Sequence, residues 1–392
     1  MWIRLLLAVA LVSGLHAYLG FRLIEPAELP GALRAALWAA LLGSVAVHPL
    51  LLLVRRDSDR PRLVQVLAWS SYSLMGAFAL VLSLVALRDF LWLLTAGLDA
   101  VWSALGKAPL LPEGEAARRA LLHQTNLAVL GIAALLAAVG YVEARRHPRV
   151  RRVRVPIEAL PEALEGFRIA QLSDVHIGPT IRRSFLEGVV AGVNALDPHV
   201  VAITGDLVDG SVEALGSHVE PLAELRSAYG AYFVTGNHEY YAGALPWVSF
   251  LSELGLDVLL NEHRVVEHAG AALVVAGVCD VSAGQFVPHH AHDPARAAHG
   301  APPGAIKLLL AHQPRSAKAA HAHGFHLQLS GHTHGGQFIP WNFFVPLQQP
   351  FVAGLHRVGE MWVYTSRGTG HWGPPLRIGA PSEITLVELC RA

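Results

Sequence analysis

The sequence Gly331-His332-Thr333-His334-Gly335-Gly336 decides how this 392-residue chain folds, and it directly follows a strand-like stretch at residues 326–329. Two histidines one residue apart between glycines suit a metal or phosphate site and little else. The glycines permit tight turns and a close approach of the backbone to a ligand. The stretch therefore predicts a sheet with a ligand-binding turn at the end of a strand.

Four more segments share this pattern, in which polar residues follow a short apolar run. In chain order they are Asp174-Val175-His176, Gly205-Asp206-Leu207-Val208-Asp209, Gly236-Asn237-His238-Glu239 and His312. Apolar runs alternate with helix-like stretches here, which predicts a layered α/β domain. Sites in such sheets form beyond the carboxyl ends of the strands. The first two of these segments are weak signals alone and the Gly236 segment is moderately specific, but all five segments in order predict one shared site.

The residue types predict the chemistry of that site. Carboxylates together with imidazoles suit Mn, Fe or Zn and argue against calcium. Asp174 and His176 can converge on one ion, and Asp206 can bridge two ions about 3.5–4 Å apart. Asn237 adds a neutral oxygen, and the set is completed by His312, His332 and His334. We therefore expect a cofactor of two divalent metal ions.

His238 adjoins a ligand, and histidine is the commonest general acid near pH 7. We expect it to be catalytic; the alternative is a histidine that only supports a ligand.

The segment from Phe167 to Leu389 resembles the calcineurin-like metallophosphoesterases, and within them a membrane-tethered branch. The resemblance rests on three motifs: Gly236-Asn237-His238-Glu239-Tyr240-Tyr241, Gly331-His332-Thr333-His334-Gly335-Gly336-Gln337, and Gly368-Thr369-Gly370-His371-Trp372-Gly373-Pro374-Pro375-Leu376-Arg377. It implies a four-layer α-β-β-α sandwich with the metals at the sheet edges.

The family pattern also implies how the ligands divide. One metal would be held by Asp174, His176, Asp206 and His334, and the other by Asp206, Asn237, His312 and His332. A metal-activated hydroxide would attack phosphorus, and His238 would protonate the leaving alkoxide or stabilise the transition state. Asp209 has no ligand role in the pattern, and we expect it to cap or brace its turn.

The first part of the chain is predicted to be an α-helical transmembrane region. The chain is 53% hydrophobic and only 15% charged, against about a quarter charged in soluble domains, and the deficit lies before Arg145. Four apolar runs approach the roughly 20 residues that span a bilayer: Trp2 to Ile24, Gly31 to Val54, Val64 to Leu87 and Leu121 to Val142. The segment from Asp89 to Leu105 suits either an amphipathic interfacial helix or a fifth span.

We expect a multi-pass membrane region with a basic linker at 1–148 and the catalytic domain at 149–392. Arginines cluster after the second and the last span, at positions 55, 56, 60 and 62 and at 145, 146, 149, 151, 152 and 154. The positive-inside rule places both clusters in the cytoplasm if there are four spans, whereas five spans would put the catalytic domain outside. Formal net charge is zero, so no nucleic-acid partner is expected.

Two groups of residues extend the predicted site. Arg367 and His371 lie on a glycine-rich loop that could contact substrate phosphate. Phe338, Trp341, Phe343 and Phe344 either dip into the bilayer, line an apolar groove or pack on the sheet.

The expected function is hydrolysis of a phosphate monoester or diester at the membrane, with lipid-linked esters as one candidate. A non-catalytic, metal-stabilised sensor or scaffold is the alternative. The sequence does not indicate the oligomeric state.

Overall fold

A computed structural model of the chain describes residues 2–56, 61–158 and 160–392. Arg60 of the expected basic connection lies outside the described residues, as do the side chains of Arg55 and Arg56. The chain forms two compact units, one up to Gly140 and one from Tyr141 to Ala392. Each unit is described by itself.

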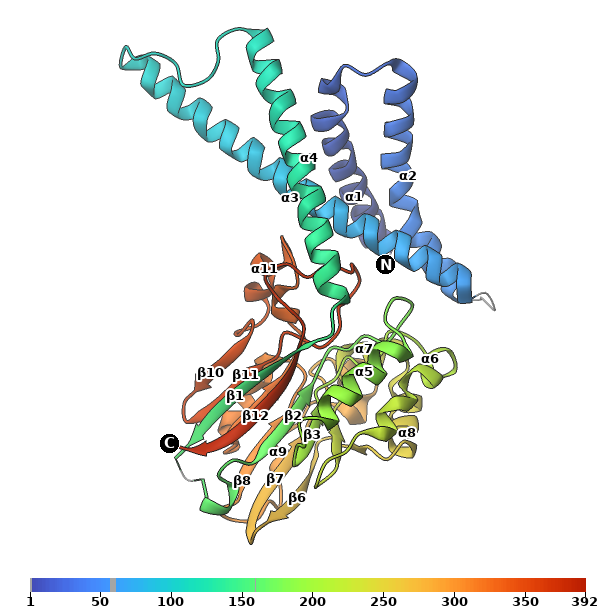
Figure 1. Cartoon of the computed structure of the whole chain (residues 1–392), viewed down its shortest axis with the longest axis vertical. Helices are drawn as coiled ribbons and strands as arrows, with labels where there is room; N and C mark the ends of the chain where they lie inside the picture. Colours follow the sequence, from blue (N-terminus) through green and yellow to red (C-terminus); the bar gives the residue numbers. More distant parts are fainter. Residues whose placement is uncertain (1, 57–60, 159) are drawn as a thin grey trace. The chain divides into compact units, whose positions relative to one another are not determined.

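The first unit consists of long helices (Figure 1). They are α1 (Trp2–Leu23), α2 (Gly31–Arg56), α3 (Pro61–Ala104) and α4 (Glu115–Arg145), of which the last continues into the second unit. Three segments are candidate membrane spans by length and hydropathy: Gly31–Val54, Arg62–Ala104 and Glu115–Arg145. When only described residues are considered, α1 is not among them.

Helix α3 differs from the sequence-based expectation. The third apolar run and the segment after Asp89 were expected to be separate, but they form one helix of 44 residues. No proline or glycine interrupts the chain between Leu87 and Phe90, so nothing there ends a helix. At 1.5 Å per residue the helix is about 66 Å long, roughly twice the hydrocarbon thickness of a bilayer.

The second unit is built on two six-stranded sheets. The first has the order β1-β12-β2-β3-β4-β5, and its strands are β1 (Arg149–Ile157), β2 (Arg168–Leu172), β3 (Val200–Ile203), β4 (Ala231–Phe233), β5 (Asp257–Val258) and β12 (Glu383–Arg391). The second has the order β10-β11-β9-β8-β7-β6, and its strands are β6 (Glu262–His268), β7 (Ala271–Gly277), β8 (Ile306–Leu310), β9 (Leu327–Ser330), β10 (Gly354–Val358) and β11 (Met361–Thr365).

Three buried apolar clusters give the domain four layers. One lies between the sheets and joins residues such as Ile169 of the first sheet to Leu308 of the second. The second cluster covers the outer face of the first sheet with α5 (Arg183–Asn194), α6 (Val212–Val219) and α8 (Ala244–Glu253). The third covers the other outer face with α9 (Pro294–Ala298) and α10 (Ala317–Ala322). Alternate residues of central strands such as β3 and β8 belong to different clusters, as the two-residue period of a strand requires. The expected α-β-β-α sandwich is confirmed.

Short helices complete the unit. They are α7 (Asn237–Ala242), α11 (Trp341–Phe344), and 3-10 turns that include η7 (His334–Gly336) and η8 (Val345–Leu347).

The strand directions gather the polar segments at one end of the sandwich. Strands β2, β3 and β4 are parallel neighbours in the first sheet, and β8 and β9 are parallel neighbours in the second. Each of the five ends two to four residues before a predicted ligand. The carboxyl ends of both sheets therefore present the predicted site residues, although these come from segments up to 160 residues apart in sequence.

Candidate metal centre

The structure brings six of the seven predicted metal ligands into clusters of possible donors. Two clusters contain only predicted ligands: Asp174, His176 and His334 in one, and Asp206, His312 and His332 in the other. A third joins His176 and Asp206 to His238. The donor atoms within each cluster lie within 4.8 Å of one another. The third cluster links the other two, because it shares His176 with the first and Asp206 with the second.

The first cluster places nitrogen and oxygen atoms around one point. The Nε2 atoms of His176 and His334 are 3.1 Å apart, and Nε2 of His334 is 3.6 Å from Oδ1 of Asp174. Asp174 is fully buried, and its carboxylate also accepts the backbone N–H of His332 at 2.9 Å. That hydrogen bond connects the turn after β2 to the turn after β9.

The second cluster is arranged in the same way. Nε2 of His312 lies 3.1 Å from Oδ2 of Asp206 and 3.2 Å from Nδ1 of His332. Nδ1 of His312 donates to the carbonyl of Thr204 at 2.8 Å, which directs Nε2 toward the cluster.

Asn237 provides an independent indication that a cation fits this site. Its Oδ1 is buried and has no hydrogen-bond partner within the described part of the chain. A buried carbonyl oxygen without a partner is costly. In addition, two imidazole nitrogens that face each other across about 3 Å cannot both donate a hydrogen, and a cation between them would resolve this conflict. The donor set, which combines carboxylate, amide and imidazole, therefore fits divalent transition metals.

Burial controls the protonation of these ligands. Burial and the neighbouring His312 lower the pKa of His332 to about 4, and burial with His176 lowers the pKa of His334 well below its usual value. Both imidazoles are therefore neutral near pH 7, which is the form that binds metals. Although burial opposes it, the imidazoles of His312 and His238 hold the pKa of Asp206 well below its usual range.

Asp209 contacts two imidazoles with one oxygen. Its Oδ1 accepts Nδ1–H of His176 at 3.0 Å and Nδ1–H of His238 at 2.6 Å. Both rings are thereby fixed with Nε2 toward the site, which is how carboxylates orient metal-binding histidines. The expectation that Asp209 braces its own turn missed this role.

His238 lies beside the candidate ligands, with Nε2 4.0 Å from Oδ2 of Asp206. Burial lowers its pKa, but the carboxylates of Asp206, Asp209 and Glu239 outweigh this and raise the pKa to about 9. The imidazole therefore carries a proton near pH 7 that it can donate.

Glu239 is a residue to which the sequence analysis gave no role. Its fully buried carboxylate accepts backbone N–H groups of Asp206 at 3.0 Å, Leu207 at 2.8 Å and Gly236 at 2.6 Å. It thus joins the turns after β3 and β4. Glutamate is favoured three residues after the N-cap of a helix, and Glu239 holds this position relative to Gly236. This pattern could have predicted that Glu239 has a structural role.

Backbone conformation at the site is unusual. Five candidate ligands have a positive φ, between 51° and 70°: Asp174, His176, Asp206, His332 and His334. Residues other than glycine rarely adopt this left-handed region. At Gly236, an added Cβ would lie 2.2 Å from Oδ1 of Asp206, so only glycine allows these two turns to approach so closely.

The loop at residues 367–377 packs against the ligands through Arg377. Its guanidinium is 1% exposed and donates to the carbonyls of Gly370 at 2.9 Å, Arg367 at 2.9 Å and Ala380 at 2.8 Å. Nη2 also lies 3.2 Å from Nδ1 of His334. The sequence analysis quoted Arg377 only within a motif, and no local pattern marks it.

The two predicted substrate contacts on this loop have different surroundings. Arg367 pairs with Glu383 at 3.3 Å and is partly exposed. His371 is buried, and burial and Arg377 lower its pKa to about 3, so its imidazole is neutral. Its Nδ1 has no hydrogen-bond partner among the described residues.

The four aromatic residues after the last histidine motif divide into two groups. Phe338 is buried, which matches the packing alternative, whereas Trp341, Phe343 and Phe344 are 45%, 66% and 49% exposed.

Two packed sheets with aspartate, asparagine and histidine donors gathered at their strand ends define the class of metallophosphoesterases. The chain belongs to the calcineurin-like phosphoesterase family, whose model matches residues 167–336. Proteins of this family bind divalent metals.

Relatives from distant organisms share the domain. A "transmembrane protein with metallophosphoesterase domain" from Danio rerio is 42% identical over 286 residues, which cover 71% of this chain and 65% of that protein. Uncharacterized metallophosphoesterases from Campylobacter jejuni and Aquifex aeolicus are 35% and 31% identical, over 69% and 66% of this chain and 70% and 97% of theirs. The chain thus spans just under two thirds of the length of its Danio rerio relative.

Proposed function

We propose that the protein is a membrane-anchored phosphoesterase that hydrolyses a phosphate ester with two divalent metal ions. One ion would be held by Asp174, His176, Asp206 and His334, and the other by Asp206, Asn237, His312 and His332. The observation that carries the proposal is the pair of ligand clusters, which a third cluster links through His176 and Asp206, together with the partnerless oxygen of Asn237.

The chemistry divides between the metals and His238. Bound metal ions supply Lewis acidity and lower the pKa of water. His238 donates a proton to the leaving oxygen, and Asp209 keeps its Nε2 directed at the site. A positioned acid of this kind contributes typically about 10²–10⁴-fold in rate.

Membrane attachment is proposed from the candidate spans and from the basic segment that follows them. All six arginines between positions 145 and 154 are exposed. Arg146 and Arg149 pair with Glu143 at 3.0 and 2.7 Å. A basic segment next to a span favours contact with anionic lipid on the cytoplasmic side, so we propose that the catalytic domain faces the cytoplasm.

The surroundings of His238 favour a substrate with an apolar leaving group. Tyr241 and Trp372 are 62% and 46% exposed, and their rings lie 5.3 and 5.9 Å from the His238 ring. Phe286 is also exposed and lies 5.6 Å from Tyr241. Two exposed aromatic rings beside the proposed acid, with a third beside Tyr241, suit the acyl or isoprenoid part of a lipid-linked ester.

The first experiment tests catalysis by the full-length protein in detergent with added Mn²⁺. A chromogenic phosphodiester and a monoester are assayed, and metal content is measured in parallel. Asp206→Asn should lose activity and metal together. His238→Ala should retain metal but lose most of its turnover, whereas His323→Ala, an exposed histidine on the same domain, should match the wild type. Normal turnover of His238→Ala would remove the acid assignment, and a metal-replete wild type inactive on both substrates would remove the enzyme proposal.

The second experiment tests the apolar leaving group and sidedness. Lysophosphatidylethanolamine should be hydrolysed more efficiently than glycerophosphoethanolamine, and Trp372→Ala should reduce that preference. Equal kcat/KM values for both esters would contradict the lipid-linked substrate. Protease protection in oriented membrane vesicles reports which side carries the catalytic domain.

A further inference from the structure

A partly buried polar cluster joins three helices of the first unit. Asp89 of α3 accepts hydrogen bonds from the Tyr18 hydroxyl at 2.5 Å and from Arg22 at 2.6 Å, both on α1. It also accepts from Nε and Nη2 of Arg88 at 2.9 and 2.7 Å. Asn126 of α4 accepts from Nη1 of Arg88 and donates to the carbonyl of Arg22 at 3.1 Å. These contacts connect residues up to 104 positions apart.

The cluster carries one positive charge in excess, because two guanidiniums share one carboxylate. Among the described residues, no second carboxylate forms an ion pair with Arg22 or Arg88. The Arg88 side chain is only 8% exposed. A charge placed among membrane helices is costly unless it is paired, and such residues usually mark a functional site. The excess charge therefore calls for an anion.

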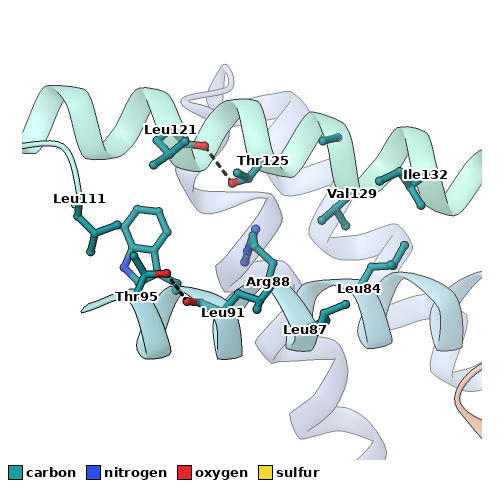
Figure 2. A pocket seen from close by; sticks show the side chains of 12 residues that line it. Leu84, Leu87, Arg88, Leu91, Thr95, Leu111, Leu121, Thr125, Val129 and Ile132 are labelled. Carbon is teal, nitrogen blue, oxygen red and sulfur yellow. Dashed lines mark hydrogen bonds between the residues drawn. The ribbon is translucent and has the colours of Figure 1, made fainter. Parts of the chain in front are cut away.

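An apolar pocket adjoins this charge. It has a volume of about 380 Å³ and lies between α3 and α4, with Leu111 of the connecting loop at its edge (Figure 2). Its walls are mainly leucine, valine and isoleucine, including Leu84, Leu87, Leu91, Leu121, Val129 and Ile132. A pocket of this size falls in the range of ligand sites, roughly 300–1,000 Å³.

Arg88 is the charged group in the pocket wall. Thr95 and Thr125 also line the pocket, but their hydroxyls donate to the carbonyls of Leu91 and Leu121 in their own helices. Figure 2 shows the Arg88 guanidinium between α3 and α4. Three of its N–H groups contact Asp89 and Asn126. A guanidinium has five, so two remain for a ligand.

The position of Arg22 suggests the depth of the cluster. Arg22 lies one residue before the end of α1, a helix of 22 residues. Such a helix is about 33 Å long, close to the hydrocarbon thickness of a bilayer. The sequence predicts α1 as a span, although it is not among the three candidate spans of the described residues; on that prediction its last turn lies near the level of lipid headgroups.

We propose that this pocket binds an anionic acyl lipid. The hydrocarbon chain lies against the apolar walls, and the anionic group accepts hydrogen bonds from Arg88 and balances the excess charge of the cluster. This site is separate from the candidate metal centre and does not depend on phosphoesterase activity.

Native mass spectrometry of the full-length protein in detergent tests the proposal. The probes are dioleoylphosphatidylglycerol, dioleoylphosphatidylcholine, oleate and inorganic phosphate. Phosphatidylglycerol or oleate should remain bound, whereas phosphatidylcholine, which has no net charge, and inorganic phosphate, which has no acyl chain, should be lost. Which anion binds more tightly distinguishes a phospholipid from a fatty acid. Equal retention of phosphatidylglycerol and phosphatidylcholine overturns the proposal, and so does binding of phosphate alone.

Two variants locate the site. Arg88→Gln removes the excess charge of the cluster. It should weaken binding of the anionic probe about tenfold or more, because the probe loses at least one charge-assisted hydrogen bond. Ala128→Trp fills the pocket from an exposed position on α4 and should weaken binding similarly, whereas Ala134→Trp, also exposed on α4 but outside the pocket, should not. Ala128 tests the site even if Arg88→Gln does not fold. Unchanged binding in Ala128→Trp, or an equal loss in Ala134→Trp, places the lipid elsewhere.

Discussion

Replacing Asp209 by asparagine should weaken metal binding and proton donation at the same time. A single oxygen of Asp209 accepts hydrogen bonds from His176 at 3.0 Å and from His238 at 2.6 Å. Asparagine keeps the shape and one acceptor oxygen but removes the charge. The change therefore tests whether the carboxylate, rather than the packing of the side chain, orients the two rings.

The expected size follows from the two hydrogen bonds. The side chains of His176, His238 and Asp209 are 1%, 16% and 17% exposed, so water screens these contacts little. A hydrogen bond to a charged group contributes roughly 1.5–3 kcal/mol and a neutral one roughly 0.5–1.5. Each bond should thus lose about 1–1.5 kcal/mol, which is about tenfold. We expect about a tenfold higher Kd for Mn²⁺ through His176 and about a tenfold lower kcat through His238.

The assay is a Mn²⁺ titration of phosphodiester hydrolysis by full-length Asp209→Asn, with metal binding measured by calorimetry. Asp257→Asn is the matched control, because Asp257 pairs with Arg264 at the surface at 2.9 Å, and such pairs contribute little. Thermal melting excludes misfolding as the cause. If Asp209→Asn keeps both the Kd and the kcat of the wild type within about twofold, the carboxylate does not orient the rings and the reasoning fails.

Three further predictions concern the metals and the buried core. Asn237→Ala should bind about one metal ion where the wild type binds two, because its buried amide oxygen has no other partner among the described residues; two equivalents by plasma emission spectrometry would contradict this. Arg377→Lys should lower the free energy of unfolding by about 3 kcal/mol, since a buried ammonium cannot replace several guanidinium hydrogen bonds, and an unchanged urea midpoint would show that these bonds are dispensable. Cys279 should resist iodoacetamide at pH 8 until the protein is unfolded, because burial raises the pKa of its thiol to about 11; rapid labelling of the native protein would be inconsistent with that burial.

The sequence predicted well those features that depend on local pattern. Short apolar runs before Asp174, Asp206 and His332 form strands, because buried strands are short and apolar. Parallel strands then place their ends at one edge, which is why residues far apart in sequence share a site. The four-layer arrangement was predicted from the family resemblance and not from the periodicity of the sequence.

Features that depend on tertiary contacts were not predictable. Glu239 acts on the backbone N–H groups of Asp206 and Leu207, and no sequence pattern shows which turns will meet. Arg377 likewise acts on the backbone, because its guanidinium donates to carbonyl groups of its own loop, and no local pattern marks this contact. The continuity of α3 was missed because the segment from Asp89 to Leu105 was expected to be an interfacial helix or a separate span. The charge of Asp89 is met by Arg22 of another helix, a contact that the sequence does not show.

The left-handed backbone at five candidate ligands has an evolutionary consequence. Each such residue costs of order 1–3 kcal/mol, so together they cost roughly as much as the whole net stability of a typical domain, about 5–15 kcal/mol. Selection for the proposed metal-dependent function would hold them in place against drift. In a duplicated gene released from that selection, replacement by glycine would be favoured by folding itself. Decayed copies should therefore be recognisable by glycine at positions 174, 176, 206, 332 and 334, while the sandwich around them persists.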